Sequence, residues 1–281
     1  MLRHLCTLLT ICAGLLAAGA ATAQALRFGV LNQRSAQLIA QAWNPVLEHV
    51  SARSGVALEL HIGKTAPDTT AMAVRGDLDF YYTNHLFTPE RAALGWSVFG
   101  RAAGDGIRAA IVVDDESPVR TLADLRERRV VFPSPEAFVG YWVPMDKLLK
   151  AGIAVQPQFA GNQEGALAQL RSRTAEAAAV NARVLEEYAR REQLRTRTLW
   201  LSEPFLDLAL MASPRVPAAT VARVRAAFIG MAQDPEGARI LEASAALTRQ
   251  KPPHGFVAAS DLDYDNYRRF YRETQVRAST P

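Results

Sequence analysis

Cysteine is nearly missing from this chain of 281 residues, and its two cysteines, Cys6 and Cys12, both fall near the start. The rest of the chain therefore has no disulfide and no thiol chemistry. Lysine is almost as scarce, since only four of the 32 basic side chains are lysines. Basic and acidic residues are mixed, as in residues 120–129, and the formal net charge is only +4. This pattern is typical of a solvated globular surface and argues against a nucleic-acid partner.

Long apolar runs are absent after residue 25, so the sequence predicts no membrane span there. The first 25 residues do contain an apolar run. Arg3 precedes the apolar run Leu5–Ala20, and the small residues of 21–25 offer cleavage positions. These are the parts of a secretory signal peptide. We therefore expect residues 1–25 to be removed and the mature protein to work outside the cytoplasm.

Catalytic and metal-binding motifs are also missing. The chain has no Gly-x-Ser-x-Gly, no His-Glu-x-x-His and no Gly-Lys-Ser/Thr phosphate loop. The four histidines beyond the signal peptide, His49, His61, His85 and His254, lack metal-ligand spacing. The sequence predicts a binding protein rather than an enzyme, with no cofactor and no metal.

Strand and helix patterns alternate along the chain. Leu26–Leu31 reads as a buried strand, and Ala36–Arg53 reads as an amphipathic helix that stops at Gly55. The alternation continues to a terminal helix over Asp263–Thr274. It predicts an α/β fold with mixed, mostly parallel sheets flanked by helices. Such sheets bind ligands at the carboxyl ends of their strands.

Three segments resemble the periplasmic solute receptors. Residues 76–80, Gly-Asp-Leu-Asp-Phe, resemble the way these proteins lead into a strand, and residues 121–132 match a further segment of theirs. Residues 132–144 resemble the ligand loop of the phosphate-, phosphite- and phosphonate-binding branch of ABC-transporter substrate-binding proteins. The order and spacing of these segments extend the similarity over nearly all of the mature chain.

The resemblance implies the type II periplasmic-binding fold, in which two α/β lobes joined by a two-strand hinge hold a ligand between them. Lobe one would comprise residues 26–108 and 204–281, and lobe two residues 109–203. Such a receptor closes around a small molecule and presents it to a membrane partner. The partner is a permease if the function is uptake, or a sensor kinase if it is signalling. A secreted enzyme on the same scaffold is a further alternative. The protein is expected to be a monomer.

The ligand loop departs from this family at the three positions before Gly140. The family typically has Ser-Thr-Ser there, whose hydroxyls and helix amides hold a phosphoryl group. This chain has Ala137, Phe138 and Val139. A hydrogen bond to a charged group contributes about 1.5–3 kcal/mol, so losing three would weaken phosphonate binding by orders of magnitude. The sequence therefore predicts that the ligand is not a phosphonate.

Other side chains suggest what replaces the anion. Phe138, Tyr141 and one of Tyr81 and Tyr82 could supply aromatic walls for a neutral ligand. Only one of the two adjacent tyrosines should reach the gap, because neighbours in a strand point to opposite faces. A cation would fit better if an acid such as Glu136 also faced the gap. Glu203 and Asp207 are the other acids that could do so.

Candidate ligand contacts follow the ends of the predicted strands and the start of a helix predicted over Phe138–Lys150. They are Asn32, Gln33, Tyr82, Asn84, His85, Phe138, Tyr141, Gln163, Asn181, Glu203 and Asp207. Each also has a structural alternative. The polar residues could form turns or cap helices, the aromatic ones could pack inside a lobe, and the two acids could form ion pairs at the hinge.

Overall fold

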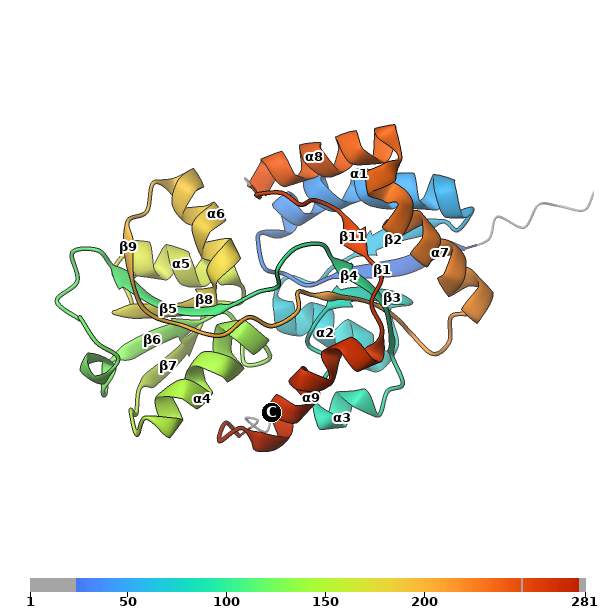
Figure 1. The fold of residues 1–281 in the computed structure, drawn as a ribbon. Coiled ribbons are helices and arrows are strands. Elements are labelled where there is room, and N and C mark those ends of the chain that lie inside the picture. The colour runs from blue at the N-terminus through green and yellow to red at the C-terminus, as the bar shows by residue number, and fades with distance from the viewer. Residues whose placement is uncertain (1–23, 249, 278–281) are drawn as a thin grey trace, which may run out of the picture.

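The computed structural model describes residues 24–248 and 250–277, which form two α/β lobes set side by side (Figure 1). The predicted signal peptide lies outside the described residues, apart from Gln24 and Ala25. Within the described part of the chain, no helix is long and apolar enough to cross a membrane. Each lobe has one β-sheet. We call the half with six strands lobe one and the half with five strands lobe two.

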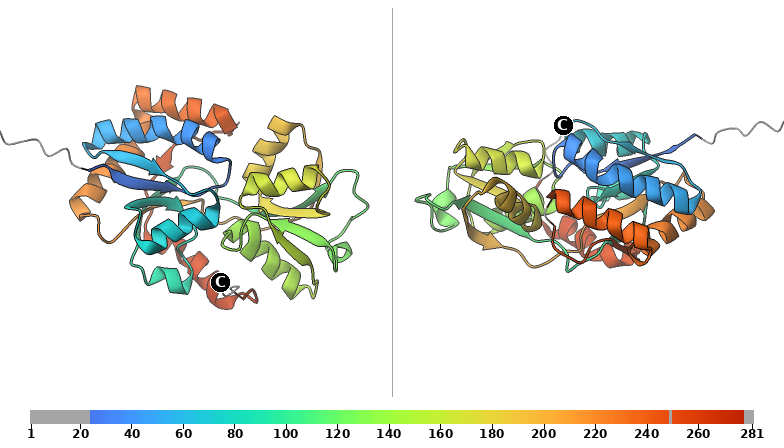
Figure 2. Two further views of the ribbon diagram at one scale, coloured as in Figure 1. Left: turned by 180° about the vertical axis from the view of Figure 1, so that it is seen from behind. Right: turned by 90° about the horizontal axis from the view of Figure 1, so that it is seen from above.

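Lobe one has the sheet order β11-β4-β10-β3-β1-β2. Its strands are β1 (Leu26–Val30), β2 (Leu58–His61), β3 (Phe80–Thr83), β4 (Ser97–Ala102), β10 (Ala209–Ala212) and β11 (Phe256–Val257). Its helices are α1 (Ala36–Ser54), α2 (Ala66–Arg75), α3 (Pro89–Ala92), α7 (Ala218–Gly230), η3 (Met231–Gln233), α8 (Pro235–Thr248), η4 (Asp261–Tyr264) and α9 (Asp265–Glu273). Helices α1 and α8 lie side by side on this lobe (Figure 2).

Lobe two has the sheet order β7-β6-β8-β5-β9. Its strands are β5 (Ala109–Asp114), β6 (Arg129–Phe132), β7 (Gln156–Phe159), β8 (Ala177–Asn181) and β9 (Thr196–Leu201). Its helices are η1 (Ala123–Leu125), η2 (Phe138–Trp142), α4 (Val143–Lys150), α5 (Gln163–Arg171) and α6 (Ala182–Glu192).

Both sheets are mixed, as predicted, but the expected parallel majority is absent among the described strands. Two of the five ladders in lobe one are parallel, and two of the four in lobe two. The cause is the route between the lobes. Strand β4 leads to β5, and β9 leads to β10, without a crossover helix, so β5 and β10 enter their sheets antiparallel to their neighbours. The two crossing segments are bridged by the antiparallel pair Ile107 and Phe205.

Local capping sets the helix boundaries. The Ser35 hydroxyl accepts from the amide of Leu38 at the start of α1, and Gly55 ends this helix in a left-handed conformation. Helix α2 begins at Ala66, because Thr65 and Asp68 form a capping box there. Strands β4, β7 and β11 were not predicted. Their sequence patterns are weak strand signals. Strand β4 contains a glycine, β7 contains a proline, and β11 has only two residues.

The predicted helix over Phe138–Lys150 has two parts. Its first turn, η2, is a π-helix in which the Trp142 amide donates to the Ala137 carbonyl at 3.1 Å. Helix α4 then continues from Val143. Pro144 explains the wide turn, because it has no amide hydrogen and its ring crowds the carbonyl four residues before it.

The largest hydrophobic core is continuous across both lobes. It includes Leu31 and Phe87 of lobe one, Phe132 and Phe138 of lobe two, and Tyr267 of α9. Two smaller cores lie within single lobes. The lobes therefore share apolar packing as well as crossing strands.

Gly140 should be required for packing at the start of this helix. A Cβ atom there would lie 2.7 Å from Pro133 Cγ and 2.9 Å from Gln163 Nε2. We expect Gly140→Ala to lower the free energy of unfolding by about 1–3 kcal/mol, measured by urea denaturation. Gly230→Ala is the matched control, because its Cβ would meet nothing within 4 Å. It should leave stability unchanged or raise it by up to about 1 kcal/mol. Equal stability of the two variants would disprove the close approach at Gly140.

Candidate functional site

A cavity of about 130 Å³ lies between the lobes, beside the crossing segments. Lobe one contributes the loop after β1, faces of α1 and α8, the end of β3 and the segment leading into β11. Lobe two contributes the start of α6. The polar side chains at the cavity are Gln33, Arg34, Tyr82, Asn181, Arg183, Asp207, Ser244, Thr248, Gln250, Lys251 and His254.

Two ion pairs flank this cavity. Arg34, from the loop after β1, binds Glu187 of α6, so this pair joins the lobes directly. Arg183 Nη1 lies 2.5 Å from Asp207 Oδ2, and its Nη2 donates to the Gly106 carbonyl at 3.1 Å. Arg183 thus fixes the start of α6 against both crossing segments.

The pair of Arg34 and Glu187 is buried. Burial lowers the pKa of Arg34 to about 10, opposed by the negative charge of Glu164, so the guanidinium stays protonated at neutral pH. The Glu187 side chain is only 1% exposed. Removing one partner would leave the other as a buried charge, which typically costs about 3–5 kcal/mol. The pair therefore depends on contact between the lobes.

An aromatic wall faces these charges. The ring centroid of Trp43 lies 4.9 Å from that of Tyr82 and 5.8 Å from that of Phe256. Burial and then the charge of Asp207 raise the pKa of Tyr82, so its hydroxyl stays protonated. The adjacent Tyr81 is fully buried on the other face, with its hydroxyl 3.1 Å from Thr70 Oγ1. Of the two tyrosines only Tyr82 lines the cavity, and its contact with a ligand stays a prediction.

Four predicted ligand contacts meet at the cavity: Gln33, Tyr82, Asn181 and Asp207. Two of them also have the structural role considered from the sequence. Asn181 Oδ1 accepts from the Arg183 amide at 2.9 Å and caps α6, and Asp207 forms the ion pair at the hinge. Their contact with a ligand stays a prediction.

Asn32 and Gln163 are buried without lining the cavity. Asn32 Nδ2 donates to the Gly63 carbonyl at 2.9 Å, and its Oδ1 accepts from Thr69 Oγ1 at 2.6 Å. Gln163 Oε1 accepts from the Asn181 amide at 2.9 Å. These side chains hold the loops that carry Gln33 and Asn181.

Asn84 and His85 follow β3 and are also buried away from the cavity. His85 Nδ1 lies 3.0 Å from Thr70 Oγ1. Burial, with Arg91 nearby, lowers the pKa of His85 well below its usual value, so the ring is neutral at pH 7. Its structural alternative, a loop histidine, matches this environment.

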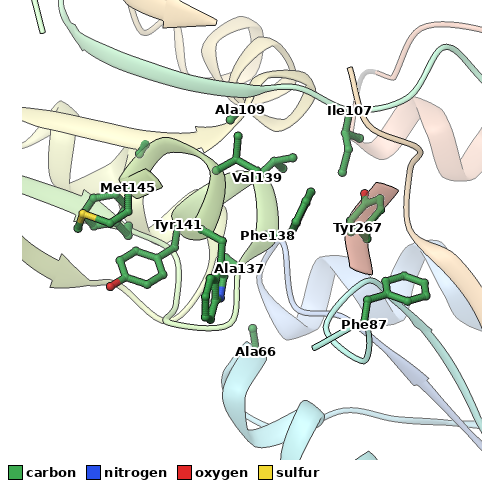
Figure 3. Packing of buried hydrophobic residues seen from close by; sticks show 14 of the residues in the cluster. Ala66, Phe87, Ile107, Ala109, Ala137, Phe138, Val139, Tyr141, Met145 and Tyr267 are labelled. Atoms are coloured by element: carbon green, nitrogen blue, oxygen red, sulfur yellow. The ribbon is translucent and has the colours of Figure 1, made fainter. Parts of the chain in front are cut away.

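Phe138 lies in an aromatic cluster that fills another part of the gap between the lobes (Figure 3). Its ring centroid is 4.0 Å from that of Tyr267 and 4.8 Å from that of Phe205. Tyr267 in turn lies 5.2 Å from Phe87 of lobe one. Phe138 is 1% exposed and does not line the cavity. The helix start where the resemblance places an anion is therefore covered by α9.

Residues 261–276, which we call the C-terminal strap, hold this cluster in place. The Tyr264 hydroxyl donates to the Asp207 carbonyl at 2.5 Å, and the Tyr267 hydroxyl donates to the carbonyl of Leu206. Beyond α9, Thr274 Oγ1 donates to Asp146 Oδ1 of α4 at 2.9 Å. The strap thus binds both a crossing segment and lobe two.

The remaining predicted contacts also lie away from the cavity. Tyr141 packs inside lobe two, 5.1 Å from the ring of Phe132. Glu203 is exposed on a crossing segment. Glu136 faces Arg91 at 3.6 Å. Among the three acids that would favour a cation, only Asp207 reaches the cavity, and Arg183 balances its charge.

Sequence reasoning missed several cavity residues. Arg34 and Arg183 lie one and two positions after the predicted contacts Gln33 and Asn181, so their positions after strands were a usable signal. Nothing in the sequence marks Trp43, Phe256 and Lys251 as neighbours of one cavity.

One group of side chains in the described residues has the ligand types of a metal site. Ligand atoms of His49, Asp234 and Glu236 lie within 4.8 Å of one another. Arg53 already binds Asp234, however, and the Gly237 amide donates to Asp234 Oδ2 at 2.9 Å. A metal would have to compete with both, so the group carries no metal assignment.

Comparison with known proteins supports the resemblance. A family model described as "ABC transporter, phosphonate, periplasmic substrate-binding protein" matches residues 28–264. A search of curated proteins gave no match.

Solved structures share the fold at low identity. PhnD1 from Prochlorococcus marinus in complex with methylphosphonate has a TM-score of 0.73 and 17% identity, covering 89% of this chain and 97% of its own. The binding component of a phosphonate ABC transporter from Pseudomonas aeruginosa gives 0.74 and 15%, covering 88% and 85%. An arginine-specific periplasmic binding protein from Salmonella typhimurium gives 0.58 and 14%, covering 79% and 99%.

The aromatic cluster makes a stability prediction. Phe138→Ala should lower the free energy of unfolding by about 3–5 kcal/mol, measured by guanidinium denaturation, because it removes a buried ring that four others surround. Leu262→Ala, at a position in the strap that is 79% exposed, should change it by less than about 0.5 kcal/mol. A loss below 1 kcal/mol for Phe138→Ala would mean that the ring faces open space.

His85 makes a pH prediction. Its folded pKa is below the unfolded value of about 6.5, so the unfolded state binds protons more readily and stability falls as the pH drops below 6.5. The slope can reach about 1.4 kcal/mol per pH unit for one group. His85→Gln should make the loss of stability between pH 6.5 and 5 shallower in urea denaturation. His61→Gln, at a half-exposed histidine, should not. Identical slopes for all three proteins would contradict a buried neutral His85.

Proposed function

Because the chain belongs to the family of periplasmic substrate-binding proteins of phosphonate ABC transporters, we propose that it captures a small solute between its lobes and delivers it to a membrane permease. The observation that carries this proposal is the shared cavity. Gln33 and Tyr82 of lobe one and Asn181 and Arg183 of lobe two all line it. A solute that touches both sides favours the lobes together over the lobes apart.

In this proposal the solute is not a phosphonate. Ala137, Phe138 and Val139 offer no hydroxyl, and Tyr267 packs against Phe138 where the anion would lie. An incoming phosphonate would have to displace a buried aromatic cluster and would then find few donors. The Prochlorococcus complex holds methylphosphonate and the Salmonella protein is arginine-specific, so this fold accepts very different solutes.

Further parts of the proposal concern the whole protein. Family membership implies a periplasmic location, and we propose that residues 1–25 are the cleaved leader and that the mature protein is a monomer. We also propose that residues 26–108 with 204–281 and residues 109–203 move as two bodies about the crossing segments. The proposal includes no catalytic step.

A membrane sensor kinase is the second candidate partner. The C-terminal strap favours it, because hydrogen bonds to Asp207 and Asp146 oppose wide opening of the lobes. Release of a solute to a permease requires opening, whereas a sensor only has to detect the liganded shape. Uptake of labelled solute by cells lacking this gene separates the two. Lost uptake supports a permease, and normal uptake with a lost transcriptional response supports a sensor.

A thermal-shift screen of the mature protein against a metabolite library should find a stabilising solute. At 100 times its dissociation constant a ligand stabilises the fold by about 2.7 kcal/mol, a Tm rise of roughly 5–10 °C for a chain of this size. Phosphonates in the library should give no shift.

Ala103→Phe places a ring at the cavity wall and should abolish the thermal shift caused by the solute. Ala93→Phe, at an exposed position after α3, should retain it. A shift that survives Ala103→Phe would place the solute elsewhere, and micromolar phosphonate binding would overturn the exclusion of phosphonates.

A further inference from the structure

The cavity wall has more positive than negative side chains. Arg34, Arg183 and Lys251 line it, against the single carboxylate of Asp207. The acids that pair with Arg34 and Lys251, Glu187 and Glu186, do not line it. On the basis of the proposed function, we propose that the solute is a small organic carboxylate with one negative charge and a compact apolar body.

Arg34 is the wall cation best suited to hold the carboxylate. Its side chain is 12% exposed, and one terminal nitrogen binds Glu187. Its Nε has no hydrogen-bond partner among the described residues. A guanidinium presents parallel donors in one plane, which match the two oxygens of a carboxylate. A carboxylate that accepts from Nε would give the Arg34 guanidinium its missing hydrogen bond.

The two other cations of the cavity wall differ in how strongly they are paired with an acid. Arg183 already has Asp207 at 2.5 Å, so this pair is neutral as a unit. Lys251 pairs with Glu186 at 2.9 Å, but the Lys251 side chain is 68% exposed and such surface pairs are weak. Lys251 can therefore turn toward an anion at low cost. Lys251 is thus the wall cation with the weakest partner, and Arg34 is the one with an unused donor.

The apolar wall sets the size and shape of the rest of the solute. Trp43, Tyr82 and Phe256 form one continuous aromatic face, and Leu241 lies beside them. A buried apolar cavity of about 150 Å³ in another protein holds one benzene molecule. The present volume of about 130 Å³ therefore fits a single ring or a short branched chain.

Other solute classes fit this wall less well. An amine would find no free acid in the wall, because Asp207 is already paired with Arg183. A phosphonate carries more negative charge than a carboxylate near neutral pH, and its extra charge would approach Asp207. A neutral amide of the same shape would lose the charged hydrogen bonds to Arg34.

Calorimetry with solutes of one shape tests the charge requirement. Benzoate would be titrated into the mature protein beside benzamide, benzylamine and phenylphosphonate, with 3-methylbutanoate as a carboxylate of different shape. We expect at least one of the two carboxylates to bind. Benzoate should bind at least about tenfold more tightly than each of its three isosteres, as expected for one charged hydrogen bond. Equal binding of benzamide, tighter binding of benzylamine, or no binding of either carboxylate at millimolar concentration would overturn the inference.

Variants test which side chains hold the carboxylate. Arg34→Gln combined with Glu187→Gln removes both buried charges together, so neither is left unpaired. It should weaken carboxylate binding by about 10- to 100-fold. Lys251→Gln, at an exposed position, should weaken it less and keeps the test open if the double variant does not fold. Arg173→Gln is the control, since Arg173 pairs with Glu116 on lobe two and does not line the cavity. Carboxylate affinity that is unchanged in both Arg34→Gln/Glu187→Gln and Lys251→Gln would overturn the inference.

Failure of this inference can be told apart from failure of the proposed function. A neutral or cationic solute that stabilises the protein, and loses its effect in Ala103→Phe, would exclude the carboxylate and leave solute capture in the cavity intact. The absence of any stabilising solute would count against capture itself.

Discussion

The contact between Phe138 and Tyr267 governs how the two lobes meet. It joins the start of a lobe-two helix to the last helix of the chain, and through Phe87 it reaches lobe one. Because these rings fill one part of the gap, the open space between the lobes lies elsewhere, beside Tyr82 and Asp207. The C-terminal strap, which carries Tyr267, connects a crossing segment with α4. The packing of Phe138 against Tyr267 thus determines both where the cavity lies and how the hinge is restrained.

The interface between the lobes has an apolar part, filled by aromatic rings, and a polar part, joined by an ion pair. Where the gap is apolar, rings exclude water and need no charge. Where it is polar, Arg34 and Glu187 approach from opposite lobes, and burial makes each depend on the other. Such a pair contributes little net stability compared with apolar packing, but it requires the lobes to meet in one register. The aromatic cluster therefore stabilises the contact between the lobes, and the ion pair fixes the register in which they meet.

The sequence predicted what depends on local patterns. The strand at Leu26, the helix capped by Ser35 and Gly55, and the unusual loop at residues 137–139 were all readable, and so was the family. Four of the eleven expected contacts reach the cavity because they lie at or next to strand ends where the two sheets face each other. The rest depends on contacts between distant residues. Nothing near Phe138 indicates that a ring about 130 positions later will cover it, and nothing near Arg34 indicates Glu187. The parallel majority was wrong because direct crossings between lobes reverse two strands, a feature of topology rather than of periodicity.

The covering of residues 137–139 by the C-terminal strap limits what substitutions at these positions can achieve. Placing Ser-Thr-Ser at these positions would not create an anion pocket, because Tyr267 would still occupy the space and three hydroxyls would be buried beneath it without solvent. Binding of an anion at this helix start would therefore require coordinated substitutions in two segments that lie far apart in the sequence. Either change alone would leave the contact between Phe138 and Tyr267 poorly packed.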